Sequence, residues 1–433
     1  MPSAMELIVS AIRRFFSCFS AMAVAAGVVR SAPVPIPAGS LTLGGSNDNT
    51  AKAARSAVLT SHWLAFWAST PLIFSDSDLI LSAGYAGIGT VARTVTRILN
   101  AHPGPFKSIS LTSYFPESER DTFAGWIRTA AAKSVNELTL HNIPWSGLYV
   151  LPSDLLRCTS LERLHVSVWK FPSTAGVLDI DNGNGDGNGV MFPHLKELVL
   201  SKSSIEEGDL ENVLTRSPVL QVLVLVLSWG VPQRVHLACA ALRCVMVCQS
   251  VVDVLDAVAA LRLERIVLWE SSGLYDSYLM RIKISRASAI KAIGYLNPTS
   301  HSLEIDGTEI KPVENPRSPN QHGDFEFWEE ISSVRCVRSS IKKVVFHGFS
   351  WEDSEIEFIN SIIGGLMLER MYIFQRRRYG TVSDDEINGK MSIIASMNLG
   401  LGRTDVVFSG EDKTWCYKVA ADLSRVDPFD CYI

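Results

Sequence analysis

The segment Leu220-Gln221-Val222-Leu223-Val224-Leu225 decides the fold, because its pattern recurs along most of the chain. Large apolar residues occupy its first, fourth and sixth positions. Segments with a similar pattern begin at Phe106 (FKSISL), Val135 (VNELTL), Leu161 (LERLHV), Leu195 (LKELVL), Leu220 (LQVLVL), Leu242 (LRCVMV), Leu263 (LERIVL), Ile290 (IKAIGY), Ile341 (IKKVVF) and Leu368 (LERMYI). Most neighbouring starts are 21 to 29 residues apart, which is the period of leucine-rich repeats.

Each repeat predicts one short strand followed by a return segment. The fourth and sixth positions point to the same side of a strand, and the first position joins them from the incoming turn. One such unit cannot bury its apolar side alone, whereas stacked units share a continuous core under a curved parallel sheet. The sequence therefore predicts an α/β leucine-rich-repeat solenoid with helical or irregular returns. An ordinary α/β sheet with leucine-rich strands is the alternative, and the near-regular spacing disfavours it.

Two intervals between repeats are longer than the others. The interval from Leu161 to Leu195 contains a Gly/Asn-rich insertion. The interval from Ile290 to Ile341 has room for a degenerate repeat, for which Leu303 and Ile305 are the candidate apolar positions.

The return segments give local signals of their own. Residues 208–216 (GDLENVLTR) have apolar residues at helical spacing and predict a helix. Residues 153–157 (SDLLR) begin with a serine of the helix-capping type. Residues 251–261 (VVDVLDAVAAL) fit a helix and a strand equally well, so both remain open.

The fifth position of each repeat is expected on the outward, concave side of the sheet. These residues are Thr139, His165, Val199, Val224, Met246, Val267, Gly294, Val345 and Tyr372. Their outward neighbours in the central repeats are apolar too, at Val222, Val226, Cys244, Cys248 and Trp269. An apolar surface of this size is normally covered. The candidate partner face is Val199, Val224, Met246, Val267 and Trp269, and either a partner or the chain's own termini would cover it.

Composition indicates a folded protein and disfavours several functions. Hydrophobic residues make up 47% of the chain and charged residues 20%, the profile of a core-forming protein. The net charge is −5, and the dispersed Lys and Arg residues form no basic stripe for nucleic acid. The motifs HExxH, GxSxG, GxxxxGK[ST] and GxGxxG are absent from the sequence. We therefore expect no enzyme, no catalytic residues, no cofactor, no nucleic-acid partner and no membrane partner.

Two segments superficially resemble metal sites. One consists of His236, Cys239, Cys244 and Cys248. Their spacing matches no standard zinc finger or ribbon, so packing is the favoured explanation. The other is residues 179–189 (DIDNGNGDGNG), but Val190 stands where a helix-loop-helix calcium site needs its bidentate carboxylate. We expect a flexible surface insertion there and no metal at either place.

The amino-terminal region contains an uncharged stretch, Phe15–Val29, with Arg13 and Arg14 before it and Arg30 after it. Its 15 residues are too few for a confident membrane span but suit the apolar core of a signal peptide. The chain has no Asn-x-Ser/Thr sequon, which is mild evidence against secretion. A targeting role for residues 13–30 and a loosely attached helix both remain open.

Several motifs follow one another in an order typical of a known family. Residues 54–67 read ARSAVLTSHWLAFW, and Leu59, Trp63 and Trp67 would share one helical stripe. Further segments are HPGPF (102–106), LPSDLLRCTSL (151–161), FPHLKEL (192–198), RSPVL (216–220), FW (327–328) and IKKVVFH (341–347). Together they resemble the plant F-box/leucine-rich-repeat proteins with a carboxy-terminal FBD region. The family's first F-box helix has no counterpart, and residues 1–50 stand in its place.

The resemblance implies a non-catalytic substrate-recognition subunit of an SCF-type (cullin) E3 ubiquitin ligase. Leu59, Trp63 and Trp67 would bind a Skp-type adaptor, and the repeat face would hold an unknown protein substrate. Alternatively, these three side chains only pack the F-box remnant onto the first repeat. A secreted or membrane-associated repeat protein that binds other proteins, and a decoy without a ligase role, are the other functions left open.

The same resemblance implies a division into four parts. They are a divergent segment (1–50), a partial F-box (51–80), leucine-rich repeats (95–320), and FBD-like repeats with a tail (321–433). The implied location is the nucleus or cytoplasm, with secretory targeting by residues 13–30 as the alternative.

Overall fold

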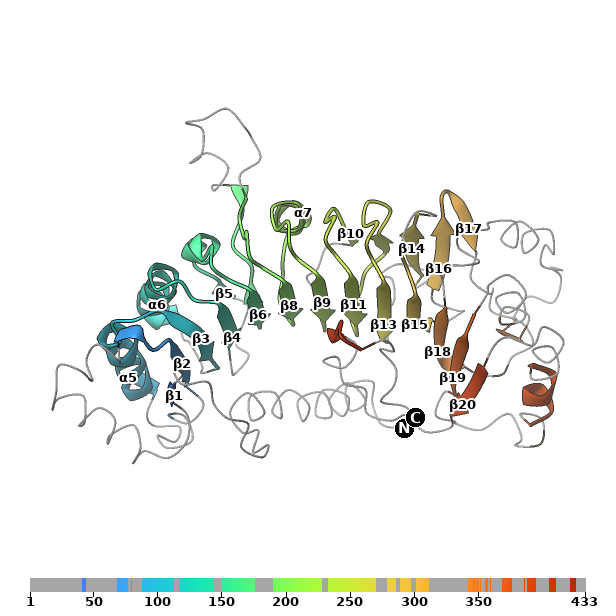
Figure 1. Ribbon diagram of the computed structural model, residues 1–433, viewed down its shortest axis with the longest axis horizontal. Helices are drawn as coiled ribbons and strands as arrows, with labels where there is room; N and C mark the ends of the chain where they lie inside the picture. Colours follow the sequence, from blue (N-terminus) through green and yellow to red (C-terminus); the bar gives the residue numbers. More distant parts are fainter. Residues whose placement is uncertain are drawn as a thin grey trace. The chain divides into compact units, whose positions relative to one another are not determined.

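The computed structural model of the chain consists mainly of short strands (Figure 1). It describes residues 41–43, 68–76, 79, 88–112, 117–142, 149–175, 190–227, 233–269, 279–285, 289–296, 301–310, 342–349, 351, 355–356, 359, 368–375, 385, 388–394, 405–409 and 421–425. The chain forms two compact units, residues 1–169 and 170–433.

The first unit combines a parallel sheet with two helices. Its elements are β1 (Leu41–Leu43), β2 (Leu72–Ser75), α5 (Ile88–Ala101), β3 (Phe106–Leu111), the 3-10 helix η2 (Glu117–Glu119), α6 (Arg120–Ala132), β4 (Glu137–His141), β5 (Tyr149–Val150), the 3-10 helix η3 (Ser153–Arg157) and β6 (Arg163–Ser167), and β7 (Trp169–Lys170) stands at its end. Strands pair in parallel in the order β1-β2-β3-β4-β6. The indole Nε1 of Trp126 donates a hydrogen bond to Thr96 Oγ1 over 2.8 Å and links α6 to α5.

The sequence HPGPF brings β2 and β3 close together. A Cβ atom on Gly104 would lie 2.3 Å from the carbonyl oxygen of Ala68, so this position has no room for a side chain. The carbonyl of the next residue, Pro105, accepts a 2.9 Å hydrogen bond from the backbone N–H of Leu72. Phe106 then enters the core with no exposed surface. The motif therefore has a steric purpose where β2 and β3 meet.

The second unit contains two sheets. Its elements are β8 (Glu197–Ser201), α7 (Glu207–Thr215), β9 (Val222–Val226), β10 (Arg234–His236), β11 (Cys244–Cys248), β12 (Val254–Asp256), β13 (Arg265–Trp269), β14 (Met280–Ile284), β15 (Ala292–Leu296), β16 (His301–Ile305), β17 (Thr308–Ile310), β18 (Lys343–Phe349), β19 (Arg370–Gln375) and β20 (Asp405–Ser409). The main sheet is parallel, with the order β8-β9-β11-β13-β15-β18-β19-β20. Figure 1 shows these strands side by side, with the return segments lying on one side of the sheet.

A single row of apolar side chains forms the core beneath the main sheet. Leu198, Leu223, Val245 and Ile266 pair in register on β8, β9, β11 and β13. Each of the four has no exposed surface. All ten segments predicted from the sequence contain a strand, namely β3, β4, β6, β8, β9, β11, β13, β15, β18 and β19. The predicted leucine-rich-repeat solenoid is thus confirmed.

Three residues that directly follow strands adopt left-handed backbone conformations. The φ angles are 48° at Lys202, 49° at Leu227 and 46° at Gln249, a region that costs a residue with a Cβ atom about 1 kcal/mol or more. Each backbone N–H donates to the last carbonyl of the next strand, at distances of 2.8, 2.8 and 2.6 Å respectively. These hydrogen bonds offset the strain and fix where each strand ends.

The return segments include more strands than the sequence indicated. Predicted helical residues 208–216 form most of α7, and residues 153–157 form η3. In the segment left open, 251–261, residues 254–256 form strand β12. Strands β10, β12, β14 and β16 pair in parallel, and β17 adds an antiparallel edge. The central returns therefore build a second sheet of five strands.

The prediction of a degenerate repeat near residues 303–305 is wrong. Strand β15 pairs directly with β18, so no strand lies between them in the main sheet. Leu303 and Ile305 belong to β16 of the second sheet. The physical reason is visible in the sequence, since Ser300 occupies the position where a repeat would need its first apolar residue.

The core row predicts a large effect for a single truncation. We expect Leu223→Ala to lower the free energy of unfolding by about 2 to 5 kcal/mol, because it removes buried methyl groups and leaves a cavity. Val219→Ala is the matched control, since this nearby side chain is 37% exposed. Urea denaturation followed by circular dichroism measures both. Equal losses in the two variants would contradict the assignment of Leu223 to the shared core.

Candidate functional site

Three neighbouring strands, β9, β11 and β13, direct three side chains each to the outward side of the sheet. Their register arranges these side chains in the rows Val222–Cys244–Arg265, Val224–Met246–Val267 and Val226–Cys248–Trp269. Val199 of β8 extends the middle row through its pairing with Val224. These ten residues are called the central outward face below.

The central outward face is buried within the folded chain. Val224, Met246 and Val267 have no exposed surface, and Val199 is 2% exposed. The structure therefore brings the candidate residues named from the sequence into one covered patch, with Trp269 half-buried at its margin. That this patch binds a partner stays a prediction.

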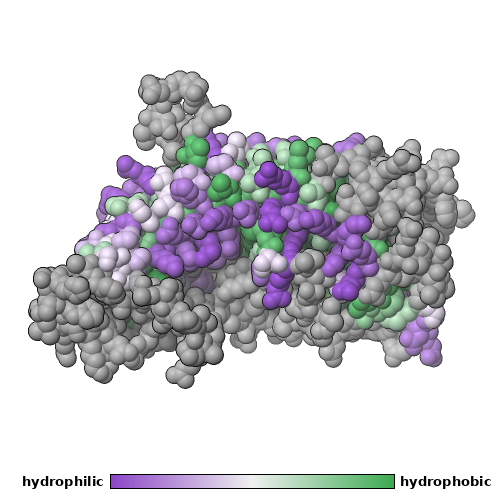
Figure 2. All heavy atoms as spheres, viewed as in Figure 1, coloured by the Kyte–Doolittle hydropathy of each residue, from purple (hydrophilic) through white to green (hydrophobic). Residues whose placement is uncertain are grey.

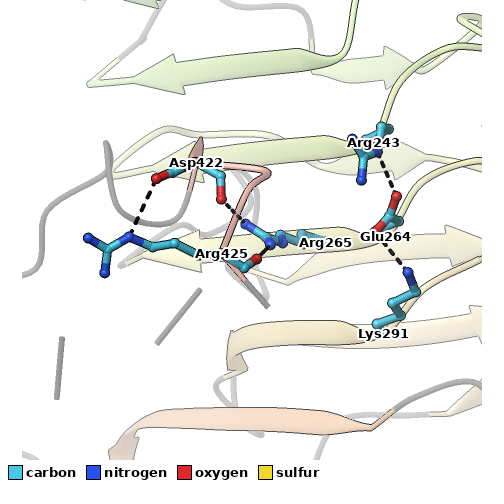
Figure 3. Close-up of polar contacts among 6 residues, drawn as sticks. All are labelled: Arg243, Glu264, Arg265, Lys291, Asp422 and Arg425. Atoms are coloured by element: carbon cyan, nitrogen blue, oxygen red, sulfur yellow. Dashed lines mark hydrogen bonds and ion pairs between the residues drawn. The ribbon is translucent and has the colours of Figure 1, made fainter. Parts of the chain in front are cut away.

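Arg265 places a guanidinium group in this apolar surrounding. The side chain is buried, and its Nη1 donates a 2.9 Å hydrogen bond to the carbonyl oxygen of Asp422. Its Nη2 donates to the carbonyl oxygen of Arg425. Figure 3 shows this carboxy-terminal turn lying against Arg265. The chain's own carboxy-terminal region therefore supplies cover for one corner of the face.

A β-bulge in β15 changes which side chain faces outward. Ile293 pairs with Val344, but the next inward pair is Leu296 with Phe346, so two residues of β15 oppose one of β18. Tyr295 lies in this bulge with a φ of 62°. The repeat pattern had assigned it to the core row as the sixth position. The bulge gives that position to Leu296, and this part of the sequence interpretation was wrong.

Tyr295 instead joins an aromatic group at the edge of the central outward face. Its ring lies 4.7 Å from that of Trp269 in an edge-to-face arrangement and 6.3 Å from that of Phe374. Tyr372 and Phe374 stack with parallel rings 6.4 Å apart. Sequence reasoning missed Arg265, Tyr295 and Phe374 as members of this region. For Arg265 a signal existed, because it is the charged residue in an otherwise apolar set of outward positions.

A row of alternating charges runs beside the face at the second position of three repeats. Arg243 Nε donates to Glu264 Oε1 over 2.6 Å, and Lys291 Nζ donates to Glu264 Oε2 over 3.0 Å (Figure 3). Burial acts to raise the pKa of Glu264, but the two hydrogen bonds and the positive charges of Arg243 and Lys291 together outweigh it and hold the pKa below its ordinary value. The carboxylate therefore links three successive repeats in its charged form.

We expect replacement of this carboxylate to cause a pH-dependent loss of stability. Glu264→Gln should lower the free energy of unfolding by about 1 to 2 kcal/mol at pH 7, because hydrogen bonds to a charged group are stronger. The lowered pKa makes this contribution complete above the unfolded-state pKa, and it is lost as pH falls through the folded-state value. Urea titrations of the wild-type and Glu264→Gln chains would measure the difference in their free energy of unfolding. They are made at pH 7 and in acid below the ordinary pKa of 4.5.

A weaker ion pair on neighbouring strands provides the control. Lys342 and Glu369 lie 4.0 Å apart, and the Glu369 side chain is 66% exposed. Glu369→Gln should therefore cost less than about 0.5 kcal/mol. A Glu264→Gln penalty that persists unchanged in acid would contradict the role given to its charge.

The cysteines of the suspected zinc cluster behave as packing residues. Cys239, Cys244 and Cys248 are buried thiols that form no disulfide, as is Cys158. Burial raises the pKa of the Cys244 thiol to about 12 despite the nearby Arg265. Burial, with a smaller effect from Asp154, raises that of Cys158 to about 12. Within the described ranges, no three His, Cys, Asp or Glu residues are grouped to hold a metal ion.

These thiols are expected to resist alkylation. At pH 8 Cys158 and Cys244 should react with iodoacetamide far more slowly in the folded chain than in urea, because the thiolate is the reactive species. Peptide mass spectrometry would locate the modified positions. Rapid labelling of Cys158 in a chain whose circular dichroism is native would contradict its raised pKa.

The described surface is largely hydrophilic on the side shown in Figure 2, where polar residues form a broad band. Among the helices that the structure describes, none is long and apolar enough to cross a membrane. Leu59, Trp63 and Trp67, the insertion 179–189 and the apolar stretch 15–29 all lie outside the described residues. Nothing here tests their predicted roles.

Comparison with known proteins identifies the repeats. Residues 123–321 match a family model described as the leucine-rich repeats of the FBD-associated F-box protein At5g56370. Residues 329–364 match the FBD domain. These matches show leucine-rich repeats and an FBD region of the type found in plant F-box/leucine-rich-repeat proteins. The family inferred from short motifs is thus confirmed, although neither matched model is an F-box.

A curated relative supports the same family. The F-box/LRR-repeat protein At3g26922 of Arabidopsis thaliana is 29% identical to this chain over 113 residues. The match covers 26% of this chain and 36% of the relative. The chain therefore spans about a third of the relative's length. The FBD match includes β18, the strand that follows β15 in the main sheet.

Proposed function

We propose that this chain is the substrate-recognition subunit of an SCF-type cullin E3 ubiquitin ligase. It would hold a protein substrate through its repeats and would contribute no catalytic group. A subunit of this kind acts by proximity, because it raises the effective concentration of the substrate near the enzyme that transfers ubiquitin.

The observation that carries this proposal is the family of the repeats, supported by the chemistry of their outward side. The central outward face and its aromatic neighbours combine Trp269, Tyr295 and Arg265 within one region. Tryptophan, tyrosine and arginine are the residue types most enriched among the energetic centres of protein interfaces. A face of this composition suits recognition of a protein segment.

The described thiols also suit a non-catalytic role. Transfer of ubiquitin through a thioester needs an accessible cysteine with an ordinary or lowered pKa. Burial instead raises the pKa of Cys158, Cys239 and Cys244. Catalysis would accordingly come from other subunits of the ligase.

The decisive experiment is capture of a Skp-type adaptor by the full chain. We expect the wild-type chain to co-purify with the adaptor and Trp63→Ala to weaken capture by about tenfold or more, as loss of a central interface tryptophan does. Leu59 and Trp67 would share its helical stripe. Ser61→Ala is the matched control, since its position falls on the opposite side of the same predicted helix.

Each outcome of the capture experiment has one meaning. Loss of capture in Trp63→Ala but not in Ser61→Ala supports the proposal. Failure of the wild-type chain to bind the adaptor overturns it and favours a repeat protein without a ligase role. Capture that is unchanged in Trp63→Ala removes this residue from the adaptor contact and supports the alternative that it packs onto the first repeat.

A further inference from the structure

Arg265 is held by backbone groups and binds a part of the chain that is remote in sequence. Arg265 as a whole residue is 5% exposed, and burial of its charge is costly unless its N–H groups are hydrogen-bonded. Two of those hydrogen bonds go to the carbonyl oxygens of Asp422 and Arg425. The fixed fork of an arginine can bind two acceptors at once. Arg265 thus binds the backbone carbonyl groups of a turn.

The turn that Arg265 binds is closed by its own side chains. Asp422 Oδ1 accepts hydrogen bonds from the backbone N–H of Ser424 at 3.0 Å and from its hydroxyl at 2.5 Å. Asp422 Oδ2 lies 3.5 Å from Nε of Arg425. The side-chain and backbone hydrogen bonds of Ser424 hold the pKa of Asp422 below its ordinary value. Local contacts therefore hold the two carbonyls in place for Arg265.

The turn and the central outward face meet at one edge of that face. Arg265 pairs in register with Cys244, which has no exposed surface and belongs to the same row of outward side chains. The side chains of Asp422 and Arg425 remain 43% and 47% exposed. Hence the turn directs carbonyl groups toward Arg265 while its charged side chains stay accessible to solvent.

We infer that the turn Asp422–Arg425 occupies, in the free chain, the place on the central outward face that a substrate peptide takes in the complex. Arg265 is the group for which the turn and the substrate compete. The inference rests on the proposed function, because it treats this face as the substrate site. Release of the turn is then a step in substrate binding.

The charges along the same row favour an acidic substrate peptide. Arg265 pairs in register with Ala292, Ala292 with Lys343, and Lys343 with Arg370. The row reaches the acidic positions Asp405 on β20 and Glu197 on β8 at its two sides, so its three cations lie between them. Neighbouring strands are about 4.8 Å apart, so a peptide that crosses them meets several of these cations. A carboxylate would bind the guanidinium more strongly than two uncharged carbonyls do, because its hydrogen bonds are assisted by charge.

Hydrogen exchange of the full chain tests whether the turn is held by Arg265. We expect Arg265→Gln to speed amide exchange in residues 421–425 by about tenfold or more, as local opening replaces a fixed contact. Alkylation of Cys244 should accelerate in parallel, whereas Cys158, which lies in the other unit, should not change. Asp422→Ala should have the same effects by opening the turn, without altering any residue of the sheet. Glu211→Gln, an exposed change on α7, is the control.

An acidic probe tests the competition itself. A poly-glutamate peptide of about ten residues, long enough to cross several strands, should speed exchange of residues 421–425 in the wild-type chain, and poly-lysine of equal length should not. The inference is overturned if residues 421–425 of the wild type exchange at unprotected rates, if Asp422→Ala leaves exchange and Cys244 labelling unchanged, or if the two probes act alike. No adaptor is present in these measurements, so their failure is distinguishable from failure of adaptor capture.

Discussion

The structure depends on one constraint, which is that the apolar side of each repeat must be covered by its neighbours. A single strand with its return buries too little surface to be stable alone. The inward row Leu198, Leu223, Val245 and Ile266 satisfies the constraint because all four residues stand in register and are fully buried. A shift of one residue in any strand would turn its apolar side chains to the other side of the sheet. The buried core therefore specifies the register of the strands strongly.

Other contacts reinforce the register that the core requires. Glu264 joins Arg243 and Lys291 across three strands at the start of the repeats. At the strand ends, the left-handed residues such as Leu227 donate their backbone N–H groups to the next strand. The repeat of β11 is thus fastened to the repeat of β13 at both ends as well as through the core. Similar hydrogen bonds between a strand end and the next strand recur at Lys202, Leu227 and Gln249 of the second unit, so repeats with unlike sequences form similar structures.

The sequence predicted those parts of the fold that depend on the repeated pattern. It did not indicate β2 and β20 as repeats. Ser69 and Arg403 stand where the pattern needs its first apolar residue, so the sequence of these two strands lacks the full pattern. It also misplaced Tyr295, since a bulge depends on the pairing with β18 rather than on residue type. The face residues Val224 and Met246 were predictable from alternation alone. The tie between Arg265 and the carboxy-terminal turn spans about 160 residues and leaves no local signal.

The outward apolar residues raise a problem of solubility that the carboxy-terminal turn helps to solve. A large exposed apolar patch promotes association, so a face that awaits a substrate, as proposed above, benefits from a cover of its own. A cover that belongs to the same chain binds intramolecularly, at an effective concentration set by the segment that connects it. A substrate can displace it only by forming contacts that the turn lacks. Backbone carbonyls hold the guanidinium with moderate strength, and a charged acceptor at the same place would exceed them. Arg265 can therefore secure the cover and still favour a substrate with the right charge.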